Sequence, residues 1–334
     1  MNNNMPLVCI CIPNYNSEKT ILQTLNSLIN QTYQNIIIKI FDNASTDDSV
    51  KILMQYAKRY PNIFLFQNTT NIGAEANFTK CIENMEGKYS TIYHSDDIYL
   101  PTIVEEEVKA LEKNNISAVF TRKKILGQYD NIEVDKTFPQ ELCVESLYTF
   151  SFKQIFGLIL KYENFLTTPS VMAKTSVYKD KIKAWDASKF NTASDLDVWL
   201  RLSEIQNIGI ISKELIHYRA TPASFSYRRR FNHFEVSDFL KVIEFYLDKY
   251  PEFNKAYFDF YTLKDSNLIV RNKILNNIKA DHSEIKLFKF SLLKLILTDK
   301  HKFKIYIFSI VYKIGLYFRA NRLLSKIIKK RYNI

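Results

Sequence analysis

Short apolar segments alternate with helix-like segments through the first 120 residues, and this pattern constrains the fold of the chain more than any other feature. The apolar segments, which predict buried strands, cover residues 7–12, 36–41, 63–66, 89–93 and 116–120. Between them, apolar residues recur every three or four positions, as Ile21, Leu25 and Leu28 do, and that period predicts amphipathic helices. Strands that alternate with helices at this spacing predict βαβ units and a mostly parallel sheet, which is an α/β fold.

The scarcity of glycine and the spacing of cysteine and histidine exclude several classes of protein. The chain has six glycines among 334 residues, and no two lie close enough for a glycine-rich phosphate loop. A P-loop NTPase, a protein kinase and a standard dinucleotide dehydrogenase are therefore disfavoured. The four cysteines and five histidines form no zinc-binding or thioredoxin-like spacing, and so few cysteines in this length predict a reduced, cytosolic protein.

Polar residues follow four of the predicted strands directly. These segments are Pro13–Asn16, Asp42–Ser45, Asn68–Gly73 and His94–Asp97. In an open α/β sheet, ligands bind beyond the carboxyl ends of the strands, so the four segments predict one polar, acidic site. Within the second segment, Ser45 is expected as the N-cap of the following helix.

Carboxylates at strand ends have two chemical uses and one structural alternative. Asp42, Asp96 and Asp97 could hold Mg²⁺ or Mn²⁺ through oxygen, or accept hydrogen bonds from ribose. A bound cation would neutralise a diphosphate, which this chain cannot cradle with a glycine loop. The alternative is that these residues are turn formers and helix caps. Asp195, just before an apolar helix, is a third acidic site, for which a helix cap is the ordinary explanation.

The chain resembles family 2 glycosyltransferases of the GT-A fold. The motifs that carry the resemblance, in chain order, are Val8–Asn16, Asn30–Tyr33, Phe41–Asp47, Asn71–Gly73, Ser95–Asp97 followed by Leu100-Pro101, and Asp195–Arg201. Together they cover about residues 5–225. The resemblance implies a Rossmann-like, mostly parallel sheet flanked by helices, with a helical C-terminal extension.

The residue pattern also divides the chain, because it is mostly helical from Asn232 onward and a boundary is expected near Arg228–Arg230. The catalytic domain is expected at residues 1–230, with a nucleotide-sugar half at 1–120 and an acceptor half at 121–230. A basic, mostly helical region is expected at 231–334.

Residues that match the motifs of the family have implied roles. Asp97 would be the direct metal ligand, Asp96 a ribose contact or second metal ligand, and Asp195 the catalytic base. The residues expected near the sugar and the acceptor are Trp185, Asp186 and Ser170. The residues expected to bind the nucleotide sugar are Pro13, Tyr15, Asp42, Asn43, Asn71, Gly73, Asn77 and Asp96.

The implied reaction is inverting transfer of a sugar from a nucleotide-diphospho-sugar, expected to be a UDP-sugar, to a hydroxyl group of a glycan or lipid-linked acceptor. A divalent metal, Mn²⁺ or Mg²⁺, would stabilise the departing diphosphate, and a single carboxylate base predicts inversion. One alternative is a polyprenyl-phosphate glycosyltransferase, which would use the same donor half. The chain departs from the family pattern at Asn43, His94, Ser194 and Thr221. These departures leave open a degenerate protein that binds sugar nucleotides or glycans without catalysis.

The positive charge of the chain is concentrated at its C-terminal end. Residues 286–334 hold 13 of the 46 Lys and Arg residues and one of the 35 acids, so the rest is near neutral although the net charge is +11. Apolar residues of this segment recur at helical spacing. A basic amphipathic helix is typical of an anchor on anionic lipid. A helical pair that packs on the catalytic domain has the same pattern, and both interpretations stay open.

The location and partners of the protein follow from these patterns. The sequence shows neither a signal peptide nor an apolar stretch long enough to span a membrane. We therefore expect a cytoplasmic protein that sits peripherally at the inner face of the cytoplasmic membrane through residues 286–334. Nucleic acid is not an expected partner, because no recognised binding module accompanies the charge. The pattern leaves a homo-oligomer open.

Overall fold

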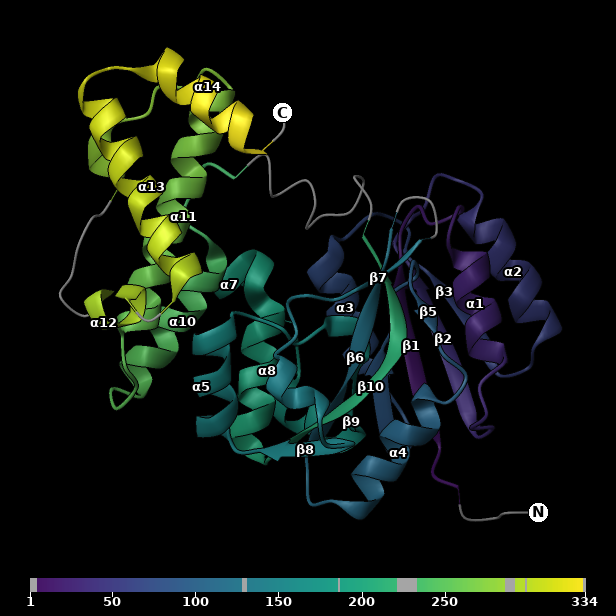
Figure 1. The fold of residues 1–334 in the computed structure, drawn as a ribbon. Coiled ribbons are helices and arrows are strands. Elements are labelled where there is room, and N and C mark those ends of the chain that lie inside the picture. Colours follow the sequence, from purple (N-terminus) through teal and green to yellow (C-terminus); the bar gives the residue numbers. More distant parts are fainter. Residues whose placement is uncertain are drawn as a thin grey trace. The chain divides into compact units, whose positions relative to one another are not determined.

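The structure is a computed structural model that describes residues 5–127, 131–185, 187–220, 233–285, 292–297 and 299–332. The contacts within the chain divide it into two compact units, Met1–Thr221 and Pro222–Ile334. The first unit is built around a sheet and the second is helical (Figure 1). The boundary expected at residue 230 lies outside the described residues.

A ten-stranded sheet forms the centre of the first unit, with the order β3-β2-β1-β4-β9-β6-β10-β5 and with β7 and β8 added beside β6 and β10. The strands are β1 (Val8–Asn14), β2 (Ile36–Asp42), β3 (Ile63–Gln67), β4 (Tyr89–Ile92), β5 (Ile98–Tyr99), β6 (Ala118–Leu126), β7 (Ile132–Val134), β8 (Leu147–Phe150), β9 (Val171–Lys174) and β10 (Ile208–Arg219). The α-helices that flank it are α1 (Ile21–Ile29), α2 (Ser49–Arg59), α3 (Ala74–Glu83), α4 (Ile103–Lys113), α5 (Phe152–Tyr162), α6 (Thr175–Val177), α7 (Ala187–Phe190) and α8 (Ser194–Ile205).

The first four strands run parallel, as the alternating pattern predicts. β1 pairs in parallel with β2 and β4, and β2 pairs in parallel with β3. β9 lies between β4 and β6 and runs antiparallel to both, which the pattern did not indicate. The predicted α/β fold is therefore confirmed, with a parallel first part and a mixed second part of the sheet.

The buried core explains why these segments become strands and helices. The side chains of β1 from Val8 to Ile12 are fully buried, so an uninterrupted apolar run is required there. In α1, Ile21, Leu25 and Leu28 occupy one face and pack into the same core. The apolar runs of the sequence thus supply the buried core of the first unit.

The prediction that Ser45 caps the helix after β2 is wrong. The helix α2 begins four residues later, at Ser49, after Asp48. Ser45 instead bonds to the strand end, because its amide and its hydroxyl both donate hydrogen bonds to the carboxylate of Asp42. Ala44 accommodates this turn with a φ of 60°, in the left-handed region. The segment therefore belongs to the strand-end loop and not to the helix.

The second unit is a set of helices with two apolar clusters of its own. Its α-helices are α10 (Asp238–Lys249), α11 (Ala256–Leu275), α12 (Leu292–Leu297), α13 (Lys300–Tyr317) and α14 (Asn321–Tyr332). One cluster joins α11, α13 and α14, and the other joins α10, α11 and α12. No helix in the described parts of the chain combines the length and the apolar character needed to cross a membrane.

Candidate active site

Hydrogen bonds connect the carboxyl ends of β1 and β2, where the residues predicted to bind the nucleoside lie. Asn14, the last residue of β1, donates a hydrogen bond of 2.8 Å from Nδ2 to Oδ1 of Asp42, the last residue of β2. Asp42 is buried, and Ser45 holds its second oxygen through a 3.1 Å bond from the backbone amide. Pro13 is half-buried beside it, whereas Tyr15 is 49% exposed. The Tyr15 ring is therefore available to a ligand.

A second polar network joins β2 to the loop before α3. The buried Asn43 donates from Nδ2 to Oδ1 of Asn71 over 2.9 Å and to the carbonyl oxygen of Gly73 over 3.1 Å. Asn77 donates to the carbonyl oxygen of Phe41 over 2.8 Å, which anchors α3 to the end of β2. The structure thus brings Asn43, Asn71, Gly73 and Asn77 together. Gly73 has a φ of 87°, a conformation that favours glycine at this turn.

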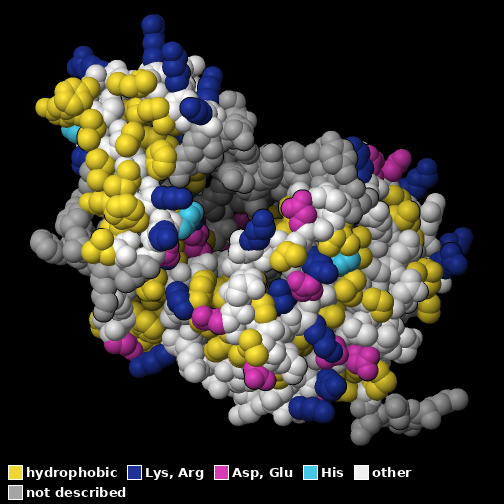
Figure 2. Space-filling view, viewed as in Figure 1, with side chains coloured by type: hydrophobic (Ala, Val, Ile, Leu, Met, Phe, Trp, Pro, Cys, Tyr) yellow, Lys and Arg dark blue, Asp and Glu magenta, His cyan; other side chains and the backbone are white. Residues whose placement is uncertain are grey.

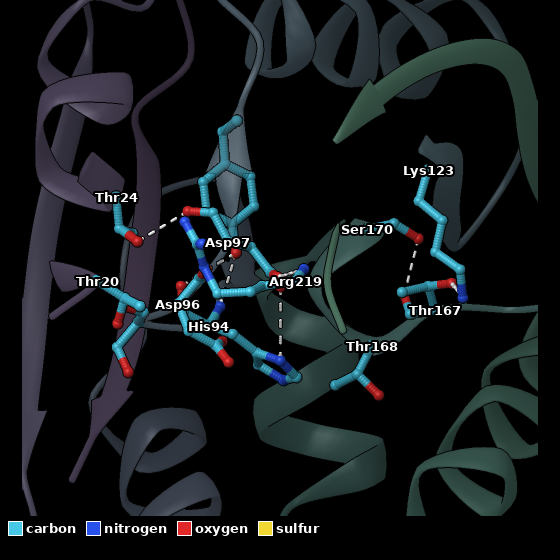
Figure 3. Close-up of polar contacts among 12 residues, drawn as sticks. Thr20, Thr24, His94, Asp96, Asp97, Lys123, Thr167, Thr168, Ser170 and Arg219 are labelled. Carbon is cyan, nitrogen blue, oxygen red and sulfur yellow. Dashed lines mark hydrogen bonds and ion pairs between the residues drawn. The ribbon is translucent and has the colours of Figure 1, made fainter. Parts of the chain in front are cut away.

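Three metal-ligating side chains meet after β4. One ligand atom each of His94, Asp96 and Asp97 lie within 4.8 Å of one another. Figure 3 shows the His94 ring facing the Asp97 carboxylate, and Nδ1 of His94 is 3.7 Å from Oδ2 of Asp97. His94, where the chain departs from the family pattern, therefore lies in the same cluster as the predicted acids Asp96 and Asp97.

The position of Asp97 is fixed from several elements. Its Oδ1 accepts a 2.8 Å hydrogen bond from the backbone amide of Arg219, at the end of β10. The Arg219 Nε donates to the carbonyl oxygen of Asp96 over 2.8 Å, and Thr24 in α1 donates to the carbonyl oxygen of Asp97 over 2.7 Å. Asp97 is fully buried, and burial together with the Asp96 charge raises its pKa well above the usual range. The carboxylate therefore needs a positive partner to stay ionised.

The atoms left over at this cluster fit a divalent cation. Among the described residues, Oδ2 of Asp97 and Nε2 of His94 are buried without a hydrogen-bond partner. Burial also lowers the pKa of His94, so its ring is neutral, which is the form that binds metal. Carboxylate oxygens and a neutral imidazole are ligands that Mn²⁺ accepts, and the carboxylates also suit Mg²⁺.

Asp195 is the second residue of α8. Its Oδ2 accepts a hydrogen bond of 3.1 Å from the Thr168 hydroxyl, and its Oδ1 accepts one of 2.7 Å from the Leu196 amide. Burial raises its pKa, although these bonds and the charge of Lys123 oppose the shift. A carboxylate with a raised pKa is a better proton acceptor than an ordinary aspartate, which suits a general base.

A lysine that the sequence analysis missed lies among these acids. Lys123 in β6 donates from Nζ to the Thr167 hydroxyl over 2.9 Å and forms an ion pair of 3.7 Å with Asp135. Its charge acts on both Asp97 and Asp195. The run Arg122–Lys124 resembles a solvated surface segment in the sequence, but β6 extends through it. Three consecutive cations give no strand pattern, so nothing in the local sequence signals the longer strand.

The remaining predicted residues surround this group. Ser170 is fully buried and its hydroxyl donates to the Thr167 carbonyl oxygen over 2.7 Å, beside Lys123 (Figure 3). The buried Trp185 packs on Phe78 at 4.9 Å between ring centroids, and Phe78 also contacts His94. The aromatic side chains of Phe78 and Trp185 thus lie next to the cluster of His94, Asp96 and Asp97. Asp186 lies outside the described residues.

Comparison with known proteins finds relatives that are named as glycosyltransferases. A protein named as an uncharacterized glycosyltransferase of Methanocaldococcus jannaschii is 29% identical over 292 residues, which cover 84% of this chain and 96% of that protein. The UDP-Glc:alpha-D-GlcNAc-diphosphoundecaprenol beta-1,3-glucosyltransferase WfaP of Escherichia coli is 27% identical over 173 residues, covering 52% of this chain and 63% of that protein.

Solved structures share the fold. S. aureus TarS 1-349 in complex with UDP-GlcNAc superposes with a TM-score of 0.58 at 16% identity, covering 98% of this chain and 91% of that one. The same protein in complex with UDP gives a TM-score of 0.55 at 16% identity, covering 92% and 89%. The model of the family described as glycosyl transferase family 2 matches residues 9–180, just over half of the chain, which run from β1 through β9 and include His94, Asp96 and Asp97. The chain therefore belongs to glycosyl transferase family 2 and is a glycosyltransferase.

Proposed function

We propose that this glycosyltransferase moves a sugar from a UDP-sugar to a hydroxyl group of a glycan or lipid-linked acceptor, with inversion at the anomeric carbon and with Asp195 as general base. The observation that carries the proposal is the presence of two separate acidic groups that share Lys123 as a charged neighbour. One is the His94, Asp96 and Asp97 cluster, and the other is the single carboxylate of Asp195.

The cluster suits the diphosphate end of the donor. Mn²⁺ or Mg²⁺ would be held by Asp97, with His94 and Asp96 beside it, and would supply Lewis-acid stabilisation of the departing diphosphate. The chain's own residues prepare that site, since Arg219 and Thr24 fix the backbone and one oxygen of Asp97. The second oxygen of Asp97 stays directed at the cluster.

The strand-end loops suit the nucleoside. Asp42 is held rigidly by Asn14 and Ser45, so a ribose hydroxyl or base would meet a carboxylate whose orientation is already set. The exposed Tyr15 ring offers a stacking surface next to it. Asn43 and Asn71 would close the far side of the same pocket.

Asp195 suits the acceptor side. In the proposed step the bond between the anomeric carbon and the diphosphate oxygen breaks and the electron pair leaves with the diphosphate. The acceptor oxygen forms the new glycosidic bond from the opposite face, and its proton passes to Asp195. A single carboxylate suffices, because no covalent sugar–enzyme intermediate is formed. Thr168 and the Leu196 amide hold Asp195 for this transfer.

Two relatives support the donor and the acceptor class. TarS of S. aureus has been solved with UDP and with UDP-GlcNAc, and its fold is shared by this chain. The name of the E. coli relative specifies a UDP-glucose donor and a lipid-linked acceptor. A UDP-sugar and a lipid-linked or polymeric glycan are therefore the substrates to test first.

The proposal is tested by a screen of UDP-, GDP- and dTDP-sugars with Mn²⁺ present, in which release of the nucleoside diphosphate is measured and the anomeric configuration of the product is read by NMR. We expect turnover with a UDP-sugar and inversion at the anomeric carbon. Retention of configuration would contradict the single-base step. Tight binding of UDP without turnover of any donor or acceptor would support the degenerate alternative instead.

A further inference from the structure

Helix α13 is apolar on two opposite faces. Ser309, Tyr312 and Leu316 are buried, and the last two belong to the cluster formed with α11 and α14. A second set of apolar residues is spaced by four, seven and four positions, so its members share one face of the helix. At about 100° per residue, that face lies opposite Ser309, Tyr312 and Leu316. The set consists of Phe303, Ile307 and Ile314 in α13 and of Phe318, the residue that caps its C-terminal end.

These four residues, named here the outer stripe, are exposed to solvent. Ile314 is 53% exposed and Phe318 is 73% exposed, and Phe303 and Ile307 are exposed as well. Figure 2 shows apolar side chains gathered on one face of the C-terminal unit, with Lys and Arg side chains beside them. The inner face of α13 already packs within the unit, so the outer stripe is not needed for the core of that unit.

Positive charges border both ends of the outer stripe. Exposed cationic residues near its start are Lys300 and Lys304, and those beyond its end are Arg319, Arg322, Lys326, Lys329 and Lys330. The only acid in residues 286–334 is Asp299, and its carboxylate already has partners at the start of α13. Its carboxylate accepts hydrogen bonds from the amides of His301 and Lys302, and it also pairs with the Lys302 side chain. The surface therefore combines apolar area with an uncompensated cationic border.

We propose that the outer stripe and its cationic border bind an anionic lipid surface, with α13 lying in the plane of the membrane interface. An apolar stripe would enter the headgroup region while the flanking Lys and Arg side chains pair with lipid phosphates. A second copy of this chain, bound through the same patch, would bring the cations of the two copies together. This inference goes beyond the sugar transfer and does not depend on it.

The test uses the full-length protein and co-sedimentation with two kinds of vesicle. One kind contains phosphatidylcholine alone, and the other contains phosphatidylcholine mixed with phosphatidylglycerol. We expect binding to the anionic vesicles that weakens as salt is raised, since the screening length falls from about 10 Å at 0.1 M to about 3 Å at 1 M. Equal binding to both vesicles, or no binding to either, would overturn the inference.

Two sets of variants separate the apolar and the charged contributions. The pair Ile314→Asn and Phe318→Asn removes exposed apolar area, and we expect affinity for anionic vesicles to fall by about tenfold or more. The pair Lys326→Gln and Lys330→Gln should weaken binding by about fivefold for each charge removed. Circular dichroism and thermal unfolding verify that each variant is folded.

The matched control replaces exposed apolar residues of the other unit. Met54 is as exposed as Ile314, and Phe64 is also exposed although less than Phe318, so Met54→Asn with Phe64→Asn should leave vesicle binding unchanged. If this control loses as much affinity as the outer-stripe variant, the assigned face is wrong. Sedimentation velocity without lipid is the second control. A concentration-dependent dimer that Ile314→Asn with Phe318→Asn dissociates, combined with no vesicle binding, would assign the face to a second copy instead.

Discussion

The two units of this chain use charged residues in opposite ways. The first unit turns its acids inward: Asp42 and Asp97 are buried at strand ends, where backbone amides and side-chain donors hold them. In the second unit, the cations Arg322, Lys326 and Lys330 of α14 are exposed. Buried acids are costly unless a ligand or ion compensates them, whereas exposed cations act at a distance on large anionic surfaces. The comparison fits the two proposals made above, sugar transfer at the strand ends of the first unit and lipid binding by the second unit.

Removal of the proposed metal ligand Asp97 should have the largest effect on sugar transfer while leaving lipid binding intact. We expect Asp97→Asn to lower kcat/KM for the nucleotide sugar by about a thousandfold, because charge developing on the diphosphate would lose its main stabiliser. Adding EDTA to the wild type should have a similar effect. Vesicle binding should not change. Asp248→Asn, at an exposed acid of the second unit, is the control for both assays and should behave as wild type.

The next effect concerns the cation between the two acidic groups. Lys123→Met should lower kcat by about tenfold to a hundredfold and move the acidic limb of the pH–rate profile to higher pH. The sign follows from charge: Lys123 lowers the pKa of Asp195, so its removal lets that pKa rise further, and more of the base is protonated at a given pH. An unshifted limb would show that Lys123 does not act on the base. Lys123→Arg should retain part of the activity.

A substitution in one unit should change the unfolding temperature of that unit and leave the other unit unaffected. In α13, a Cβ on Gly315 would come within 2.6–2.9 Å of the Leu324 side chain in α14, so Gly315→Ala should destabilise the second unit by about 1 kcal/mol or more despite better helix propensity. A Cβ on Gly157 in α5 would meet no neighbouring atom within 4 Å, so Gly157→Ala should be neutral or stabilising. Calorimetry with and without UDP distinguishes the units. A single transition lowered equally by both substitutions would argue against independent units.

The smallest expected effect lies in the core of the first unit. Glu107 is fully buried, and burial raises its pKa well above the ordinary value, although the Tyr93 hydroxyl donates to it over 2.8 Å. A raised folded-state pKa contributes stability below the unfolded pKa of about 4.3, and that stability is lost as pH rises through the folded pKa. Glu107→Gln should therefore raise the unfolding temperature by a few degrees at alkaline pH and by less at acidic pH. A difference that is constant with pH would contradict this.

The sequence predicts the strands in the first half of the first unit, but it does not predict all the strands in the second half of that unit. The parallel strands β1 to β4 could be predicted because each is a short apolar run between amphipathic helices, and the acids at their ends could be placed for the same reason. The antiparallel insertion of β9 could not, because its partner strands β4 and β6 lie far from it in the sequence.

Local patterns also misled at two places in the site. Ser45 precedes two aspartates and a helix, which is typical of a cap, but the buried Asp42 competes successfully for its hydroxyl and amide. Lys123 and Arg219 follow apolar strands as charged residues, which normally indicates solvent. They reach the site because β6 and β10 extend beyond their apolar cores and pair with each other up to Leu126 and Arg219. Such pairing depends on tertiary contacts that no local pattern contains.

The central claim is that Asp195 performs the proton transfer while other residues bind the donor, and it is tested most directly by measuring turnover and nucleotide binding in the same variant. For Asp195→Asn we predict that kcat falls by about a thousandfold, the range expected for loss of a general base, while the affinity for UDP with Mn²⁺, measured by calorimetry, changes less than about threefold. Turnover within tenfold of wild type, or a parallel loss of nucleotide affinity and turnover, would contradict the account.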